Sequence, residues 1–204
     1  GITEVPATWE EYYEAAKKIR ALGDDYYISN EAGDIFLLLS MIWEAGGQPF
    51  TYDGDTVEID FSDKNTQEVL SYWQKMIDED LITNDIAIWS DDWNRTLNDG
   101  TLSTQIIGGW MTANLPPRAP DAAGDWRVAP MPQWNEGENY SAENGGSTLA
   151  ILQASEKKDA AFKFVEYITH GDGVQARVDA NATVPNTSVL ESEEYLGLAD
   201  DYYG

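Results

Sequence analysis

Segments with helical spacing alternate along this chain with short apolar runs. The helical spacing is found at residues 9–22, 35–45, 64–79, 91–97, 156–170 and 173–180. Runs with the length and composition of strands lie at residues 26–28, 57–61, 103–107, 126–130 and 148–152. Because this alternation is typical of domains that layer helices on a sheet, we expect an α/β fold with a short mixed sheet flanked by helices.

Local sequence also predicts where several helices begin and end. Thr8 and Glu11 have the spacing of a capping box, Asp34 precedes the helix at 35–45, and Ser155 precedes the helix at 156–170. The segment 35–45 is hydrophobic nearly all round, so we expect it to be largely buried, with Gly46-Gly47 as its end. The inner face of the helix at 156–170 is expected to comprise Ala161, Phe164, Val165 and Ile168.

Turns and loops are expected between these segments. Asp53-Gly54 predicts a hairpin, and residues 30–33 predict a turn. The carboxylates of Asp53, Asp55 and Asp60 do not have the spacing of a calcium loop, so we expect no metal site there. Residues 116–124 and 133–145 are rich in proline, glycine or polar side chains, and we expect exposed loops.

Composition excludes several classes of site and partner. With 204 residues, the chain can form one large domain or two small ones, and its net charge of −25 disfavours nucleic acid and anionic lipid as partners. It contains no cysteine, which excludes disulfides and thiolate zinc sites. His170 is the single histidine, so a Ser-His-Asp triad or a multi-histidine metal site has little material.

Aromatic residues point toward a binding surface. Trp110 follows Gly108-Gly109 at the end of the apolar run 103–107, in which Ile106 and Ile107 are expected to be buried. Open α/β sheets bind ligands at the carboxyl ends of their strands, and a flat indole there is suited to stacking on the apolar face of a sugar ring. The alternative is a core tryptophan after a sharp turn.

The order of these parts resembles the extracellular solute-binding proteins of carbohydrate ABC importers, the group that includes maltose-binding protein. The resemblance covers most of the chain and rests on Thr8-Trp9-Glu10-Glu11, on the helix ending in Gly46-Gly47, on Asn98-Asp99-Gly100 through Trp110, on residues 126–132, and on Gly145-Gly146 followed by the capped helix at 155–168.

The resemblance implies one lobe of a type II periplasmic-binding-protein-like fold. Residues 1–8 correspond to the segment that leaves the interdomain hinge, and residues 9–204 to the C-terminal lobe of a two-lobe protein. It further implies a first lobe before Gly1 and closing helices after Gly204.

The resemblance also implies which residues face the sugar. These are Trp110, Asp34, Phe36, Trp43, Asn144, Gly145 and Gly146. Each has a structural alternative: Asp34 as a helix cap, Phe36 and Trp43 as core residues, and Asn144 as part of a loop.

The function implied is non-enzymatic capture of a mono- or oligosaccharide, without metal or cofactor, for delivery to the membrane permease of an ABC importer. The resemblance places the parent protein outside the cell, lipid-anchored or periplasmic, as a monomer. Two other hypotheses stay open: a glycoside hydrolase that uses paired carboxylates, and an acidic module that binds cations or a basic partner.

Overall fold

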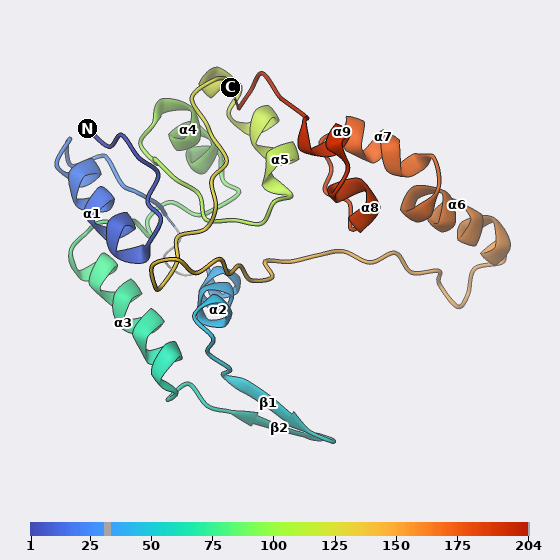
Figure 1. Ribbon diagram of the computed structural model, residues 1–204, viewed down its shortest axis with the longest axis horizontal. Helices are drawn as coiled ribbons and strands as arrows, with labels where there is room; N and C mark the ends of the chain where they lie inside the picture. The colour runs from blue at the N-terminus through green and yellow to red at the C-terminus, as the bar shows by residue number, and fades with distance from the viewer. Residues whose placement is uncertain (31–33, 204) are drawn as a thin grey trace. The chain divides into compact units, whose positions relative to one another are not determined.

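The computed structural model describes residues 1–30 and 34–203 (Figure 1). The chain divides into two compact units. Unit 1 comprises Gly1–Ile107 and Val128–Gly145, and unit 2 comprises Gly108–Arg127 and Gly146–Gly204. The assignment of residues 9–204 to a single lobe stays a prediction, and the turn expected at 30–33 falls largely on residues 31–33, outside the described residues.

Unit 1 contains the helices α1 (Trp9–Arg20), α2 (Ile35–Glu44), α3 (Lys64–Asp78) and α4 (Asp91–Asp99). The predicted capping box at the start of α1 is confirmed, because the Thr8 hydroxyl accepts from the Glu11 amide while the Glu11 carboxylate accepts from the Thr8 amide. This pairing satisfies amides that lack partners within the helix.

The core of unit 1 forms where the apolar faces of α1, α2 and α3 meet. Its members, each buried, include Trp9, Tyr12, Ala16, Leu37, Met41, Ile42, Val69, Trp73 and Met76. Gly47, just after α2, allows this approach: a Cβ there would lie 2.7 Å from both the Ile42 Cγ2 and the Thr66 Oγ1 atoms. The close contact between the end of α2 and α3 therefore requires glycine.

Short parallel pairings replace the longer strands that the sequence predicted in unit 1. The segment 27–29 forms single bridges to Leu102 on one side and Ile82 on the other, and Thr8 forms a third bridge to Gln133. Hydrogen bonds extend the first pairing, from the Ser103 amide to the Tyr27 carbonyl and from the Thr104 amide to the Ile28 carbonyl.

The strand predicted at 103–107 is wrong beyond Thr104, the last residue that bonds to segment 27–29. Ile106 and Ile107 are half-buried rather than buried, because the pairing with segment 27–29 ends before them. A strand needs a partner along its whole length, which an apolar run alone does not supply.

The predicted hairpin is confirmed. Strands β1 (Phe50–Asp53) and β2 (Thr56–Ile59) pair antiparallel, with Phe50 opposite Ile59 and Tyr52 opposite Val57. The hairpin extends away from α2 and α3 (Figure 1), and apart from half-buried Phe50 its strand residues are exposed. One of its faces carries these four apolar side chains, since alternate residues point to one side.

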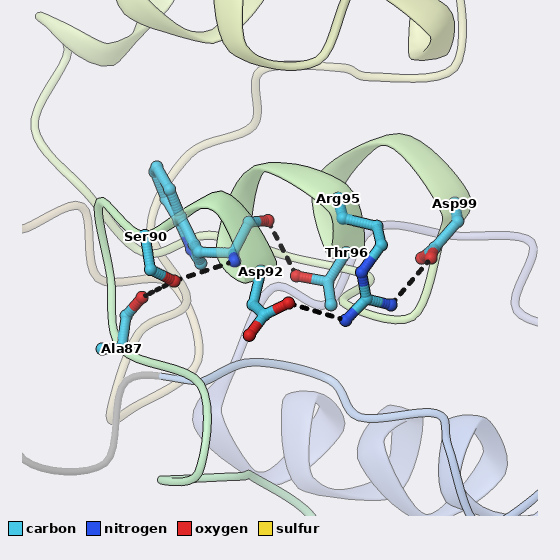
Figure 2. Close-up of polar contacts among 7 residues, drawn as sticks. Ala87, Ser90, Asp92, Arg95, Thr96 and Asp99 are labelled. Atoms are coloured by element: carbon cyan, nitrogen blue, oxygen red, sulfur yellow. Dashed lines mark hydrogen bonds and ion pairs between the residues drawn. The ribbon is translucent and has the colours of Figure 1, made fainter.

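Helix α4 shows how local polar contacts define a short helix (Figure 2). The Ser90 hydroxyl accepts from the Trp93 amide at 3.1 Å and lies 2.7 Å from the Ala87 carbonyl. Arg95 pairs with Asp92 one turn earlier, at 3.2 Å, and with Asp99 one turn later, at 3.7 Å. The N-cap and these i,i+3 and i,i+4 pairs stabilise a helix that ends at Gly100.

Unit 2 contains α5 (Met111–Arg118), a 3₁₀ turn at Pro120–Ala122, α6 (Lys158–His170), α7 (Gly173–Asp179), α8 (Thr187–Leu190) and α9 (Glu193–Leu196). The loop expected at 116–124 is therefore wrong at its start, where Pro116 and Pro117 lie within α5. Proline removes the amide that would bond the carbonyl four residues earlier. For Pro116 that carbonyl belongs to Thr112, and the Tyr203 hydroxyl donates to it instead, at 2.7 Å.

Two further strand predictions are wrong. Residues 126–130 and 148–152 form neither strand nor bridge, and Leu149 and Leu152 are 54% and 74% exposed rather than buried. The helix after them begins at Lys158, and the Ser155 hydroxyl accepts from the Lys157 amide outside the helix instead of capping it.

Unit 2 buries side chains in two places. Val174, Val178 and Val184 form a small buried cluster around α7. In and after α5, the buried residues are Met111, Leu115, Ala119, Ala122 and Tyr202. Helix α6 buries none of its residues, and Phe164, expected on its inner face, is 59% exposed.

Candidate functional site

Helix α2 divides into a buried face and an exposed aromatic face. It buries Leu37, Ser40, Met41, Ile42 and Glu44. Phe36 is 73% exposed and Trp43 is 40% exposed, so the prediction of a largely buried helix is wrong on this side. Because seven residues make about two helical turns, Phe36 and Trp43 project from the same side of α2. The structure therefore excludes the interpretation of these two rings as fully buried core residues.

Asp34 places a carboxylate at the start of this face. Its Oδ1 accepts hydrogen bonds from the Phe36 and Leu37 amides at 2.8 and 3.3 Å, so the predicted helix cap is confirmed. The side chain is half-buried, next in the chain to the exposed start of α2. Capping holds the carboxylate against the Phe36 amide, at the start of the exposed aromatic face.

Ser40 joins α2 to the loop that carries Asn144. Its hydroxyl lies 2.9 Å from the Phe36 carbonyl and 2.6 Å from the Glu143 carbonyl, and Asn144 Nδ2 donates to it at 3.3 Å. The loop expected at 133–145 is therefore held against α2 at this point. Ser40 was not among the predicted site residues, although a single hydroxyl within the apolar run 35–43 indicates a polar contact.

Gly145 and Gly146 follow at once. Gly145 has φ +84°, a left-handed conformation that favours glycine, and it turns the chain directly after Asn144. Gly146 belongs to unit 2, and a Cβ built on it meets nothing within 4 Å. The structure thus brings Asp34, Phe36, Trp43, Asn144 and Gly145 into one unit, on α2 and the loop bonded to it.

Trp110 lies in unit 2 as the N-cap residue of α5. Its carbonyl accepts from Asn114 Nδ2 at 2.9 Å, and its side chain is half-buried rather than sealed inside a core. That Trp110 acts together with the α2 residues stays a prediction.

Glu44 is the second polar residue of α2 that the sequence analysis missed. It is 5% exposed and accepts from the Trp9 indole Nε1 at 3.1 Å. Burial raises the pKa of Glu44 to about 7, against the opposing effect of the Trp9 and Trp134 indole N–H groups. This carboxyl group therefore changes charge near neutral pH.

Metal binding and membrane crossing find no support in residues 1–30 and 34–203. No group of three or more His, Asp or Glu side chains there is arranged to hold a metal ion. None of the helices in this part of the chain is both long and apolar enough to span a bilayer.

Comparison with known proteins identifies a family and relatives in sequence. Residues 1–172 match the family described as bacterial extracellular solute-binding proteins. A lactose-binding protein from Rhizobium radiobacter is 25% identical over 200 residues, covering 97% of this chain and 46% of that protein. The chain thus spans about half the length of this curated relative.

Solved structures agree with the sequence matches. The ABC transporter associated binding protein from B. animalis subsp. lactis Bl-04, in complex with β-1,6-galactobiose, is 44% identical with a TM-score of 0.87, covering 97% of this chain and 51% of that one. The sugar-binding protein MalE from Xanthomonas citri shares the fold at 22% identity, with a TM-score of 0.73 and coverage of 99% and 51%. These similarities confirm the expected α/β fold, of the type II periplasmic-binding-protein kind.

Proposed function

This chain belongs to the family of bacterial extracellular solute-binding proteins, and from this premise we propose that it carries part of a site that binds a carbohydrate without chemically altering it. One observation carries the proposal: two exposed aromatic rings, Phe36 and Trp43, lie on one side of α2 beside the bonded Asn144 loop. Exposed rings offer flat apolar surfaces for the C–H faces of a sugar, and carboxylate and amide groups bind its hydroxyls.

The relatives narrow the ligand class. One solved relative holds β-1,6-galactobiose, and one sequence relative is named a lactose-binding protein. Both sugars are disaccharides that contain galactose. We therefore propose a galactose-containing disaccharide as the ligand of the protein to which this chain belongs.

Family membership also supports a proposal for the location and the partner of the protein to which this chain belongs. A protein of this kind captures sugar outside the cytoplasm, at the cell surface or in the periplasm, and delivers it as a monomer to the permease of an ABC importer. Lipid anchoring at the cell surface is part of this proposal. The family match lends no support to the glycoside hydrolase hypothesis.

The test measures binding of β-1,6-galactobiose to the 204-residue chain. Binding is monitored by saturation-transfer NMR at millimolar sugar, with lactose and maltose for comparison. We expect weak binding of galactobiose. Phe36→Ala should weaken it by about 5- to 150-fold, since a stacked aromatic contact is worth on the order of 1–3 kcal/mol. Trp43→Ala should act in the same direction, and Trp110→Ala as well if Trp110 joins the site.

Tyr52→Ala is the matched control, because Tyr52 is an aromatic residue of the hairpin with 75% exposure. Its removal should leave sugar binding unchanged. Equal loss in Tyr52→Ala and Phe36→Ala, or no loss in Phe36→Ala and Trp43→Ala, would show that α2 does not form the site.

A further inference from the structure

Glu44 lies in a buried aromatic cluster that links three parts of unit 1. The Trp9 ring of α1 lies 5.5 Å from Tyr12, 5.7 Å from Tyr72 of α3 and 5.7 Å from Trp134. The Tyr72 hydroxyl donates to the Trp9 carbonyl at 2.8 Å. Because the Trp9 indole donates to Glu44, the carboxyl group of α2 is bonded into this cluster.

Trp134 belongs to the segment 131–145, which ends in the loop of Asn144. The neighbouring Gln133 pairs its backbone with the entry to α1, accepting from the Trp9 amide at 3.0 Å and donating to the Ala7 carbonyl at 2.9 Å. The Gln133 side chain also bonds both backbone groups of Tyr140, at 2.9 and 2.6 Å. The first half of the segment is therefore fixed at the aromatic cluster.

The second half of the segment is fixed at Ser40. Ser40 and Glu44 are four residues apart, so they occupy the same buried face of α2, one turn from each other. Ser40 contacts Glu143 and Asn144 directly. Glu44 is linked to the first half of the segment through Trp9, which donates to Glu44 and whose ring lies 5.7 Å from Trp134.

We propose that Glu44 is a positioning residue for the Asn144 loop: its carboxyl group joins α2 to Trp9, whose ring packs against Trp134, and its proton keeps the segment 131–145 packed against the buried face of α2. Loss of that proton leaves a charge in a desolvated site, which loosens the segment. The relevance to sugar binding rests on the proposed function, whereas the link between Glu44 and the loop does not.

The surroundings of Glu44 set the pH at which this happens. Burial raises the pKa of Glu44 to about 7, the Trp9 and Trp134 N–H groups lower it, and the charge of Glu138 on the same segment raises it. Within the described residues, the Trp134 N–H is buried without a hydrogen-bond partner. Tyr72 from α3 stays neutral, because burial raises the pKa of its phenol far above the ordinary value.

The test follows the ¹⁵N-labelled chain by NMR from pH 5 to 9, in a His170→Gln background that removes the one imidazole. The indole N–H signals of Trp9 and Trp134, assigned with Trp→Phe variants, should shift with a common midpoint near 7. The backbone amides of Asn144 and Gly145 should follow with the same midpoint. Glu44→Gln, which keeps the shape and the acceptor oxygen, should abolish both titrations.

Two matched variants keep the test decisive if Glu44→Gln folds poorly. Glu138→Gln should retain the titration and lower its midpoint, because a neighbouring negative charge is removed. Trp134→Phe keeps a ring but removes the N–H, so its midpoint should rise. Midpoints that do not move in these directions overturn the assignment to Glu44.

The decisive contrary result is an indole titration that the amides of Asn144 and Gly145 do not share. It would leave Glu44 as a buried acid with no influence on the loop. Since these signals are read without sugar, failure of galactobiose to bind overturns the proposed function alone. With sugar present, we expect the affinity of the unmodified chain to depend on pH between 6 and 8, and Glu44→Gln to remove this dependence. If the affinity of the unmodified chain does not change over this range, the result counts against the proposal.

Discussion

Helices α2 and α6 are both rich in apolar side chains, yet they are buried to very different extents. Helix α2 buries Met41 completely and leaves Phe36 and Trp43 exposed beside polar groups. Helix α6 buries no residue, and Phe162 and Phe164 are each 59% exposed. An apolar stripe therefore predicts which side of a helix can pack, but burial depends on a partner elsewhere in the chain.

The largest expected effect is a difference in the unfolding free energy lost when an apolar side chain is removed from α2 or from α6. Met41→Ala should lower the free energy of unfolding by about 2–5 kcal/mol, because it leaves a cavity in the core of unit 1. Phe164→Ala should change it by less than about 0.5 kcal/mol, as expected for an exposed site. Urea denaturation followed by circular dichroism measures both, and equal losses would show that α6 packs as firmly as α2.

The second effect is a pH dependence confined to the buried face of α2. The pKa of Glu44 is about 7 in the folded chain and about 4.5 as its ordinary value. The folded state therefore holds the proton more tightly, and this contribution to stability is complete below pH 4.5 and is lost as the pH rises through 7. The loss amounts to about 3 kcal/mol, at 1.36 kcal/mol for each pKa unit.

The measurement compares the unmodified chain with Glu44→Gln by urea denaturation at pH 5 and pH 8. The difference in unfolding free energy between the two should change with pH in favour of Glu44→Gln at pH 8. Using the difference cancels other acids, such as Asp60 and Asp63, whose pKa values are lowered by hydrogen bonds from Ser62 and Thr66. A difference that stays constant would assign the pH dependence to other groups.

The smallest effect concerns the first turns of the two helices. Asp34→Ala removes the cap of α2 and should lower local stability by about 1 kcal/mol. Ser155→Ala, before α6, should have a smaller effect, because α6 has no side-chain cap bond. Amide hydrogen exchange at Phe36 and Leu37, compared with the first amides of α6, measures these losses, and equal losses would mean that Ser155 supports α6 after all.

Most features that depend on neighbouring residues were predictable from the sequence, although the expected Ser155 cap of α6 does not form. The capping box of α1, the Asp34 cap and the Asp53-Gly54 hairpin each rest on contacts within a few residues, and all are observed. The runs at 103–107, 126–130 and 148–152 were not predictable in this way, since a strand forms only when a distant segment supplies hydrogen bonds. The loop predicted at Pro116 was wrong for the same reason. The hydroxyl that bonds the Thr112 carbonyl in place of a Pro116 amide belongs to Tyr203, which is distant in sequence.

The candidate site was predictable in part. Asp34, Phe36 and Trp43 were expected on α2, and the structure shows that these rings are exposed. The buried polar residues of the same helix, Ser40 and Glu44, were not predicted, because its hydrophobicity alone indicated only apolar packing. A hydroxyl and a carboxyl on an apolar helix must find partners when buried, and their presence in the sequence was evidence for such partners.

The hairpin of β1 and β2 affects how copies of the chain associate in solution. In the described part of the chain, β1 and β2 pair with each other alone, so their outer edges present open backbone groups next to Tyr52 and Val57. Such edges invite strand addition by another molecule. Asp53, Asp55 and Glu58 surround them, and like-charge repulsion keeps copies of this very acidic chain apart. Added salt, which screens this repulsion, should therefore promote aggregation that starts at the hairpin.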